Sequence, residues 1–352
     1  MSQVKGSDQK VITGHKAVRE ALRDTETYSS DLQGDSDVRD YRQIPLEVDP
    51  PRHHLYRNAL GPYFVKPTIE KSIPEFRTHS ELLIRRYFSG GGKDVISTLA
   101  LPLVMQNLGV LYKRPQDVDE WISWGPDVWT AESHVRDGRV LHSYLDRIYA
   151  EALTGSSADV WSEIATLEIE GKVISESEFR GIAGVMLAGG RDTVVKLFTG
   201  ILWHFAKVPE DLELLRNRPE VIPTAIQEFL RYLTPLPQMA RTTVPETGAN
   251  ELPDDRYVGI SFISGNFDET VFDNPFEIDL SRVKVPHLSF GFGPHTCIGN
   301  HIAEMEARVF LETLINSELT WEVESSDIKF HQAPYESVPD SFRNLVLRTR
   351  NS

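Results

Sequence analysis

Apolar residues recur with helical spacing over most of the chain, from about residue 15 to about residue 235. Between about residues 240 and 300 the pattern changes to short extended segments separated by proline and glycine, and a helical pattern then returns. The alternating strand and helix units of a βαβ fold are missing, and a β-sandwich is disfavoured as well. The pattern therefore predicts a mainly α fold with small β-sheets.

The longest predicted helix begins near Ser175. Ser175 and Glu178 have the spacing of a capping box, in which each side chain accepts a hydrogen bond from the other residue's backbone N–H. Apolar faces continue to about residue 206, and Pro209 prevents a simple continuation. Roughly thirty residues at 1.5 Å each make a helix about 45 Å long. We expect such a helix to cross the domain and to be mostly buried.

A pair of glycines, Gly189 and Gly190, lies in the middle of this helix. Each glycine costs about 1 kcal/mol relative to alanine in a helix interior, so the pair needs a compensating reason. One explanation is close packing against another helix. The other is that the helix opens where a ligand approaches, which places Asp192 and Thr193 beside the gap. The helical pattern by itself leaves both explanations open.

The composition narrows the class of protein. The 352 residues include 52 acidic residues against 37 lysines and arginines, and the net charge of −15 argues against a nucleic-acid-binding protein. The N-terminus has no apolar segment typical of a signal peptide. The apolar window from Val95 to Tyr112 is interrupted by polar residues and predicts a buried helix, so we expect no membrane segment. The single cysteine, Cys297, cannot form an intramolecular disulfide, which favours a reducing, cytoplasmic location.

The segment from Phe290 to Gly299 surrounds that cysteine. Its glycines allow a tight loop that approaches a flat ligand, and the helical pattern that follows directs a helix N-terminus toward Cys297, where a thiolate would be favoured. A dinucleotide-binding loop is excluded because position 296 is not glycine and no βαβ unit surrounds it. A zinc site is equally poor, since there is no second cysteine and no His-Glu-x-x-His pattern.

This segment closely resembles the haem-binding signature of the cytochrome P450 family, Phe-x-x-Gly-x-x-x-Cys-x-Gly. The resemblance implies a P450 fold with haem b between the long helix and the cysteine loop, and Cys297 as the axial thiolate ligand of the iron. Gly189 to Thr193 resemble the family's oxygen-binding signature, which favours the functional explanation of the glycine pair. The loop residues that the resemblance assigns to the cofactor are Phe290, Gly291, Gly293, His295, Cys297 and Gly299.

Further matches lie in the family's order and approximate spacing. Glu228 and Arg231 are similar to the Glu-x-x-Arg motif, which implies a buried scaffold for the haem loop. His53 and Arg57, one helical turn apart, resemble the bacterial Asp-Pro-Pro-x-His-x-x-x-Arg segment and would hold haem propionates. Arg241 resembles the arginine that binds the other propionate.

The resemblance extends from about residue 10 to the C-terminus, so one P450 domain with a shortened N-terminal region accounts for residues 1–352. The chain departs from the family pattern at two further places. Phe267 stands in the middle of a segment that is Asn-Arg-Asp in the family, and Arg191 is a bulky charge beside the expected catalytic acid.

The resemblance implies a monooxygenase that inserts one oxygen atom from O2 into a substrate and draws two electrons from a reductase chain. Asp192 and Thr193 would relay protons through water. A peroxide-driven peroxygenase or a redox-neutral enzyme is an alternative, which the intact Asp192-Thr193 pair disfavours. A haem-binding sensor without turnover is a third possibility. A separate ferredoxin or flavodoxin with its reductase is the expected electron donor.

The substrate pocket follows from the family positions. Its apolar residues predict a small to medium hydrophobic substrate. The region from Tyr112 to Leu145, with Trp121, Trp124, Trp129 and His134, is a candidate lid, although core packing is the simpler role for any one tryptophan there. The expected pocket residues, together with Gly189, are Val185, Ala188, Leu236, Pro237, Gln238, Met239 and Val338.

Overall fold

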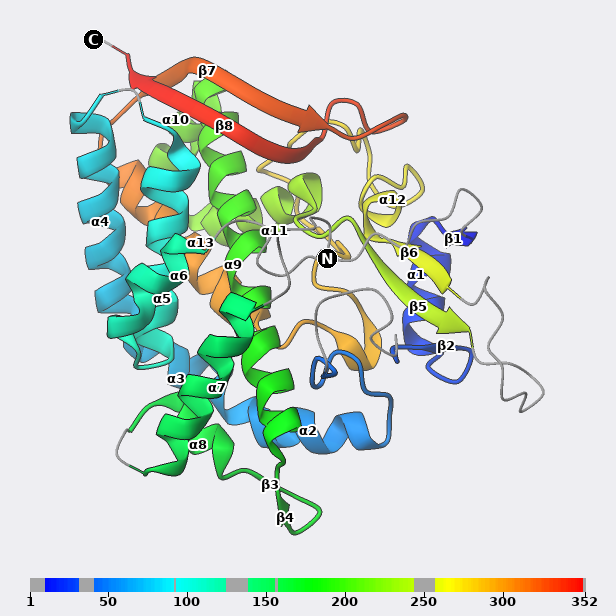
Figure 1. Cartoon of the computed structure of the whole chain (residues 1–352). Helices are drawn as coiled ribbons and strands as arrows, with labels where there is room; N and C mark the ends of the chain where they lie inside the picture. Colours follow the sequence, from blue (N-terminus) through cyan, green and yellow to red (C-terminus); the bar gives the residue numbers. More distant parts are fainter. Residues whose placement is uncertain are drawn as a thin grey trace.

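A long central helix, α9 (Glu176–Lys207), organises the molecule. The computed structural model describes residues 10–31, 41–91, 93–124, 139–155, 158–243 and 257–350. Helices α4 to α8 lie on one side of α9, and a small sheet with α1 lies on the other side (Figure 1). The helices around α9 are α1 (His15–Arg23), α2 (Arg52–Leu60), α3 (Lys66–Ile69), α4 (Ile73–Ser89), α5 (Leu101–Leu111), α6 (Val118–Ser123), α7 (Arg139–Leu153), α8 (Val160–Ala165), α10 (Pro209–Asn217), α11 (Ile222–Leu233), α12 (Phe262–Asn266) and α13 (Asn300–Asn316).

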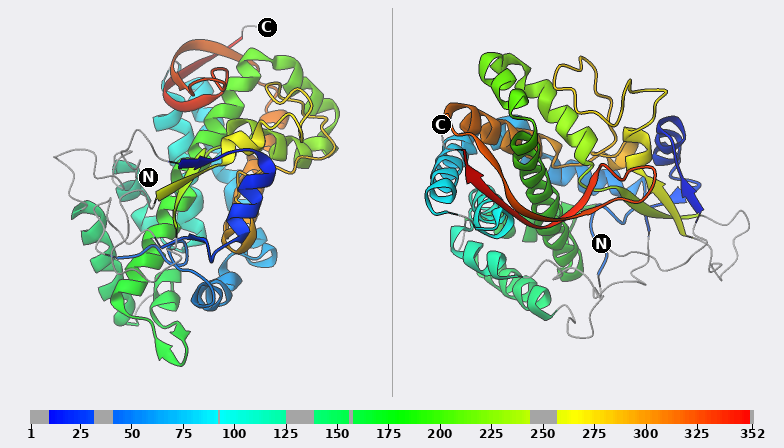
Figure 2. Two further views of the ribbon diagram at one scale, coloured as in Figure 1. Left: turned by 90° about the vertical axis from the view of Figure 1, so that its right-hand side faces the viewer. Right: turned by 90° about the horizontal axis from the view of Figure 1, so that it is seen from above.

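The strands form small separate sheets. The largest has the order β1-β6-β5-β2, in which β1 runs parallel to β6 and the other neighbours are antiparallel. Seen from above, the β7–β8 hairpin crosses one end of α9 (Figure 2). The prediction of a mainly helical fold with small sheets is confirmed. The strands are β1 (Lys10–Ile12), β2 (Tyr28–Ser29), β3 (Glu168–Ile169), β4 (Lys172–Val173), β5 (Gln238–Thr243), β6 (Tyr257–Ser261), β7 (Trp321–Phe330) and β8 (Pro339–Thr349).

The predicted ends of the central helix are confirmed. Ser175 caps α9: its Oγ accepts a hydrogen bond from the Glu178 N–H at 3.3 Å, and the Glu178 carboxylate accepts one from the Ser175 N–H at 2.7 Å. The helix ends at Lys207, and Pro209 begins α10. Its 32 residues span about 48 Å at 1.5 Å per residue. The helix is long enough to contact most other parts of the fold.

Helices α5 and α13 form much of the core against α9. Phe198 of α9 stacks on Phe310 of α13 with ring centroids 4.3 Å apart. The Tyr112 hydroxyl, at the end of α5, donates a hydrogen bond to the Met186 carbonyl of α9 at 2.8 Å. The apolar window from Val95 to Tyr112 is therefore a buried helix, as predicted, with a π-helical turn at Ile96–Ala100 before α5. Within the described ranges, no helix combines the length and apolar character needed to cross a bilayer.

Two tryptophans of the expected lid pack in the core. Trp121 and Trp124 are buried in the main hydrophobic core, where both rings contact Tyr144 of α7 edge to face. Trp129 and His134 lie outside the described residues. The described tryptophans thus have the core-packing role.

A buried acid lies between α13 and α5. Glu306 is 2% exposed, and its Oε1 accepts a hydrogen bond from Asn107 Nδ2 at 3.0 Å. Its other oxygen has no hydrogen-bond partner among the described residues. Burial raises the pKa of Glu306 from 4.5 to about 8, and the Asn107 hydrogen bond opposes this only in part. The carboxyl group is therefore mainly protonated at neutral pH.

Replacing this acid should change the pH dependence of stability. Between its ordinary pKa of 4.5 and the folded value of about 8, native Glu306 holds a proton that the unfolded chain has released, so rising pH destabilises the native state. Glu306→Gln removes this effect. We expect the free energy of unfolding of Glu306→Gln to rise relative to that of the unaltered protein as the pH increases. From about pH 5 to about pH 8 this relative gain should reach about 2 to 4 kcal/mol, measured by urea unfolding at each pH. Glu312→Gln, at a partly exposed position of α13, is the control. A pH-independent difference would contradict the raised pKa.

Candidate functional site

The cysteine loop, residues 288–299, is a tight turn closed by its own backbone. The Cys297 N–H donates to the Phe290 carbonyl and the Gly291 N–H to the Leu288 carbonyl, both at 2.8 Å. Gly291 and Gly293 have φ angles of +68° and +72°. A Cβ at Gly293 would lie 2.8 Å from the Leu22 carbonyl oxygen. Glycine is therefore required at residue 293 both for its backbone conformation and for its close approach to α1.

The thiol of Cys297 is accessible but has protein atoms packed around it. Burial among these atoms raises its pKa, while the Gly299 N–H and Arg57 act in the opposite direction. Helix α13 begins at Asn300. In the protein without a bound metal, burial therefore opposes the thiolate that the following helix is expected to favour. A bound metal cation would remove the thiol proton.

One face of the central helix is accessible although the helix crosses the core. Between residues 181 and 206, every position outside this face except Gly190 is buried. The accessible positions recur every three or four residues, which places them on one side of the helix. We call this side the open face of α9. Its residues are Val185, Ala188, Gly189, Asp192, Thr193 and Lys196.

The two glycines of α9 have different surroundings. A Cβ at Gly190 would lie 3.0 Å from Leu108 Cδ2, so this glycine permits close packing of α5 on α9. A Cβ at Gly189 would meet no atom within 4 Å, so Gly189 borders open space. The expected opening of the helix is absent, because α9 continues through both residues. The Gly189 carbonyl accepts a hydrogen bond from Thr193 Oγ1 at 3.0 Å.

The arginine beside the expected catalytic acid does not enter the open face. Arg191 is 2% exposed, and its Nη2 donates a hydrogen bond to the Trp124 carbonyl at 2.8 Å. Its Nη1 lies 3.3 Å from Asp192 Oδ1. Half of the Asp192 side chain is exposed, and surrounding protein raises its pKa although Arg191 lowers it. Arg191 thus forms an ion-pair contact with Asp192 and does not occupy the open face.

Basic side chains from three distant segments meet near the cysteine loop. His53 and Arg57 come from α2, Arg241 from β5, and His295 from the loop itself. The His53 and His295 rings have centroids 4.1 Å apart. Both ring nitrogens of buried His53 lack a hydrogen-bond partner among the described residues. The structure therefore brings together all of the residues expected to hold propionates.

The electrostatics of this cluster favour an anionic ligand. Burial, with Arg57 and His54, lowers the pKa of His53 to about 4, and burial lowers that of Arg241 to about 10. Asp49 supplies some negative charge, but it already accepts hydrogen bonds from the Ser29 hydroxyl and the Ser30 N–H. Buried cations without matching carboxylates are costly. A group that carries carboxylates, such as haem, fits these residues.

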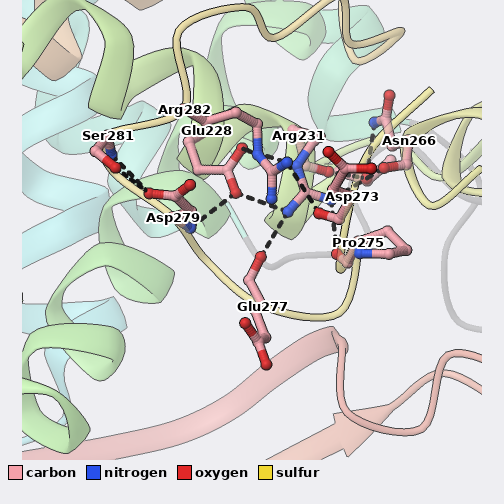
Figure 3. A network of polar contacts seen from close by, with 10 residues as sticks. Glu228, Arg231, Asn266, Asp273, Pro275, Glu277, Asp279, Ser281 and Arg282 are labelled. Atoms are coloured by element: carbon pink, nitrogen blue, oxygen red, sulfur yellow. Dashed lines mark hydrogen bonds and ion pairs between the residues drawn. The ribbon is translucent and has the colours of Figure 1, made fainter. Parts of the chain in front are cut away.

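The Glu-x-x-Arg pair forms the centre of a buried polar network (Figure 3). Glu228 and Arg231 are both 0% exposed and form a two-point ion pair, with contacts of 2.7 and 2.8 Å. Arg231 also donates to the carbonyls of Asn266, Pro275 and Glu277 at 2.7 to 3.0 Å. All five of its N–H donors are thus used, two by Glu228 and three by backbone carbonyls of residues 266–277.

This network continues to the cysteine loop. Asn266 Nδ2 donates to Ser289 Oγ at 2.8 Å, and Asn266 Oδ1 accepts from the Leu288 N–H at 2.6 Å. Ser289 Oγ in turn donates to the Leu230 carbonyl of α11 at 2.6 Å. The unusual Phe267 is buried, with its ring 5.4 Å from the Arg231 guanidinium carbon. The departure from the family pattern thus places an aromatic face beside the buried cation.

The remaining expected pocket residues have different surroundings. Leu236 and Met239 pack against a small core formed mainly by α1 and β6, and Pro237 is partly accessible. Gln238 is exposed and covers Gly259 of β6. Val338 is fully buried in the main core. Their contact with substrate stays a prediction.

Comparisons with known proteins assign the family. A family model described as Cytochrome P450 matches residues 215–334. A probable cytochrome P450 from Sinorhizobium fredii is 30% identical over 307 residues, which cover 84% of this chain and 73% of that protein. The chain belongs to the cytochrome P450 family.

Other P450 relatives match nearly the whole chain. Erythromycin C-12 hydroxylase from Saccharopolyspora erythraea is 29% identical over 96% of this chain and 86% of its own length. The solved structure of a carbohydrate-active P450 has a TM-score of 0.86 and 30% identity, and the match covers 96% of this chain and 91% of that one. The protein is thus a haem-thiolate monooxygenase, an oxidoreductase that uses O2, an organic substrate and a redox partner.

One accessible residue of this P450 site was missed from sequence. Lys196 follows Thr193 by three positions and lies on the same open face. The signal was available, because a lysine at this helical spacing from the oxygen-binding signature shares its face.

Removing the buried arginine should destabilise the P450 scaffold. Arg231→Met leaves the carbonyls that it binds, and much of the Glu228 charge, without a donor, so we expect a loss of about 3 to 5 kcal/mol in the free energy of unfolding. Guanidinium unfolding of the holoenzyme measures this loss. The control, Arg218→Met, removes an ion pair whose side chains are 53% and 66% exposed, and should cost less than about 1 kcal/mol. Equal losses of unfolding free energy in the two variants would contradict the expectation that the buried ion pair contributes more than the exposed one.

Proposed function

We propose that this P450 enzyme inserts one oxygen atom from O2 into a small to medium hydrophobic organic substrate, at haem b held by Cys297. The proposal is carried by two features of the structure, an accessible thiol in the glycine-rich cysteine loop and the accessible face of α9 that holds Asp192 and Thr193. When bound, the haem supplies O2 binding and oxygen transfer, and its thiolate ligand favours cleavage of the O–O bond. The residues of the chain bind the cofactor, supply protons and position the substrate.

The buried basic cluster is proposed to hold the haem carboxylates. His53, Arg57 and Arg241 present donors to one region, and His295 closes it from the loop side. Arginine suits carboxylates because its planar guanidinium forms two parallel hydrogen bonds. Phe290, Gly291, Gly293 and Gly299 are proposed to shape the loop against the flat cofactor. Binding would bring carboxylates to Arg57 and Arg241, which form no ion pair among the described residues.

Protons are proposed to reach the site through Asp192 and Thr193. Asp192 is half exposed on the open face, and its raised pKa makes it a better proton donor near neutral pH. The Thr193 hydroxyl donates to the Gly189 carbonyl, and its oxygen can still accept a hydrogen bond from a water molecule that Asp192 contacts. The intact pair favours O2 over peroxide as the oxidant.

The remaining parts of the proposal concern the substrate, the partner and the extent of the domain. Val185, Ala188 and the segment from Leu236 to Met239 are mainly apolar, which suits a hydrophobic substrate. A separate ferredoxin or flavodoxin is the proposed electron donor. Arg19 and Arg23 lie over the Phe292 ring at 4.1 and 4.5 Å, so a basic surface borders the cysteine loop. Residues 1–352 are proposed to form one domain that works in the cytoplasm.

The absorption spectrum of the reduced protein with carbon monoxide tests the ligand assignment. We expect a strongly red-shifted Soret band, because a cysteine thiolate donates electron density to the iron. Cys297→Ser should lose that band while the fold stays intact by circular dichroism. A red-shifted band that persists in Cys297→Ser would exclude Cys297 as the ligand.

The proton relay predicts a coupling defect. Thr193→Ala removes the hydroxyl, so electrons should be consumed with product formation reduced by roughly tenfold or more. The ratio of product formed to NAD(P)H oxidised, in a reconstituted system, measures the effect. Thr199→Ala, a buried threonine of the same helix outside the open face, is the matched control. Unchanged coupling in Thr193→Ala would contradict the assigned role.

A further inference from the structure

Lys196 is the cationic member of the open face of α9. It follows Gly189 by seven residues and Thr193 by three, and all of these positions are accessible. Outside the open face, every position between residues 181 and 206 except Gly190 is buried. Residues with this spacing lie on one side of a helix. The Lys196 side chain therefore begins on the surface that borders the proposed substrate pocket.

The ammonium group of Lys196 has few partners. Its Nζ donates to the Thr234 carbonyl at 3.4 Å, which is a long hydrogen bond. Within the described residues it forms no ion pair closer than 4.0 Å. Burial lowers its pKa to about 8, and the nearby charge of Asp340 opposes this only in part. Three ammonium donors at this position thus have one weak acceptor from the protein.

The nearest acidic group is already engaged. Asp340, at the start of β8, forms an ion pair with Lys329 at 2.6 Å and lies 3.7 Å from His331 Nδ1. The charged and titratable groups around Lys196 on the hairpin are therefore one carboxylate, one lysine and one histidine. The single carboxylate has two basic neighbours besides Lys196. Burial lowers the pKa of His331, so this ring is uncharged at neutral pH, while Lys329 pairs with Asp340. Lys196 therefore keeps a positive charge that can bind an anion.

The surroundings of Lys196 are those of the proposed substrate pocket. Thr234 directly precedes the segment Pro235-Leu236-Pro237, which is partly accessible. Asp340 follows Val338 on the other side. The lysine stands between these segments, one helical turn beyond Thr193. The Cα atoms of Thr193 and Lys196 are separated by a helical rise of about 4.5 Å. An extended lysine side chain adds several ångströms to the distance between Thr193 and the ammonium group.

We propose that Lys196 binds a carboxylate of the substrate, so that the substrate class is a hydrophobic organic acid. This inference rests on the proposed monooxygenase function and deepens it. The apolar residues of the pocket contact the hydrocarbon part, and the ammonium group anchors the acid at the far end of the open face. Because Lys196 lies beyond Thr193, the oxidised carbon is remote from the carboxylate. Anchoring one end of the molecule selects which carbon is presented for oxidation.

Calorimetric titration of the holoenzyme with matched acids and alcohols tests the anchor. The probes are octanoate against octan-1-ol and decanoate against decan-1-ol, which differ in the anionic group and share the hydrocarbon chain. A charged hydrogen bond predicts that at least one acid binds roughly 10- to 100-fold more tightly than its alcohol. Lys196→Met and Lys196→Gln should abolish this preference and change the alcohol affinity by less than about twofold. Lys196→Arg should retain much of it.

The matched control is Lys329→Met, which removes a neighbouring lysine that pairs with Asp340 on the hairpin. This variant should keep the preference for acids. The proposal is wrong if the unaltered holoenzyme shows no preference in either pair, or if the preference persists in both Lys196→Met and Lys196→Gln. The carbon monoxide spectrum of each sample separates this result from the proposed function. A red-shifted Soret band without acid preference refutes the anchor alone, and its loss in the unaltered protein refutes the haem-thiolate assignment.

Discussion

The buried ion pair between Glu228 and Arg231 is the interaction on which the site depends most directly. Arg231 satisfies the carbonyls of an irregular segment, residues 266–277, that has little regular structure to satisfy them. An unpaired buried carbonyl costs free energy comparable to a lost hydrogen bond. One guanidinium therefore anchors to the core a long loop, most of whose residues are exposed. Through Asn266 and Ser289 the same network fixes the point where the cysteine loop begins.

Buried charged groups are paired in the scaffold around Glu228 and Arg231 but, in the described part of the chain, largely lack partners at the proposed cofactor site. In the scaffold, Glu228 and Arg231 bind each other and their neighbours, and almost every donor has an acceptor. At the site, the nitrogens of His53 have no partner among the described residues, and Arg241 is buried with one described hydrogen bond, to its neighbour's carbonyl. Such groups are costly in the chain alone. Their cost is offset when a ligand brings carboxylates, so the binding free energy of the cofactor also stabilises the fold.

The same reasoning extends to the two sides of the cofactor site. On the cysteine side, burial raises the pKa of the thiol, so the protein without metal disfavours the thiolate that the enzyme uses. On the side of α9, an incompletely paired lysine lies on the same face as the proposed proton relay. In both places the chain supplies a group that the proposed ligand would complete, a metal cation for the thiol and a carboxylate for the lysine.

The sequence determined much of the fold and the chemistry of the site. The capping box and the apolar spacing of α9 predicted the central helix and both of its ends, because helix caps and periodicity are local properties. The cysteine loop and the family resemblance indicated the haem ligand, and their order along the chain assigned the other motifs.

Only the tertiary structure decided how these parts act. It divided the glycine pair into Gly190, which packs against Leu108, and Gly189, which borders open space. It directed Arg191 to the Trp124 carbonyl and left the helix face that carries Lys196 accessible. It also opposed the expected effect on the Cys297 thiol, because burial depends on atoms contributed by the whole chain. Periodicity places a residue on a face of its own helix, but what lies opposite that face is set by segments distant in sequence.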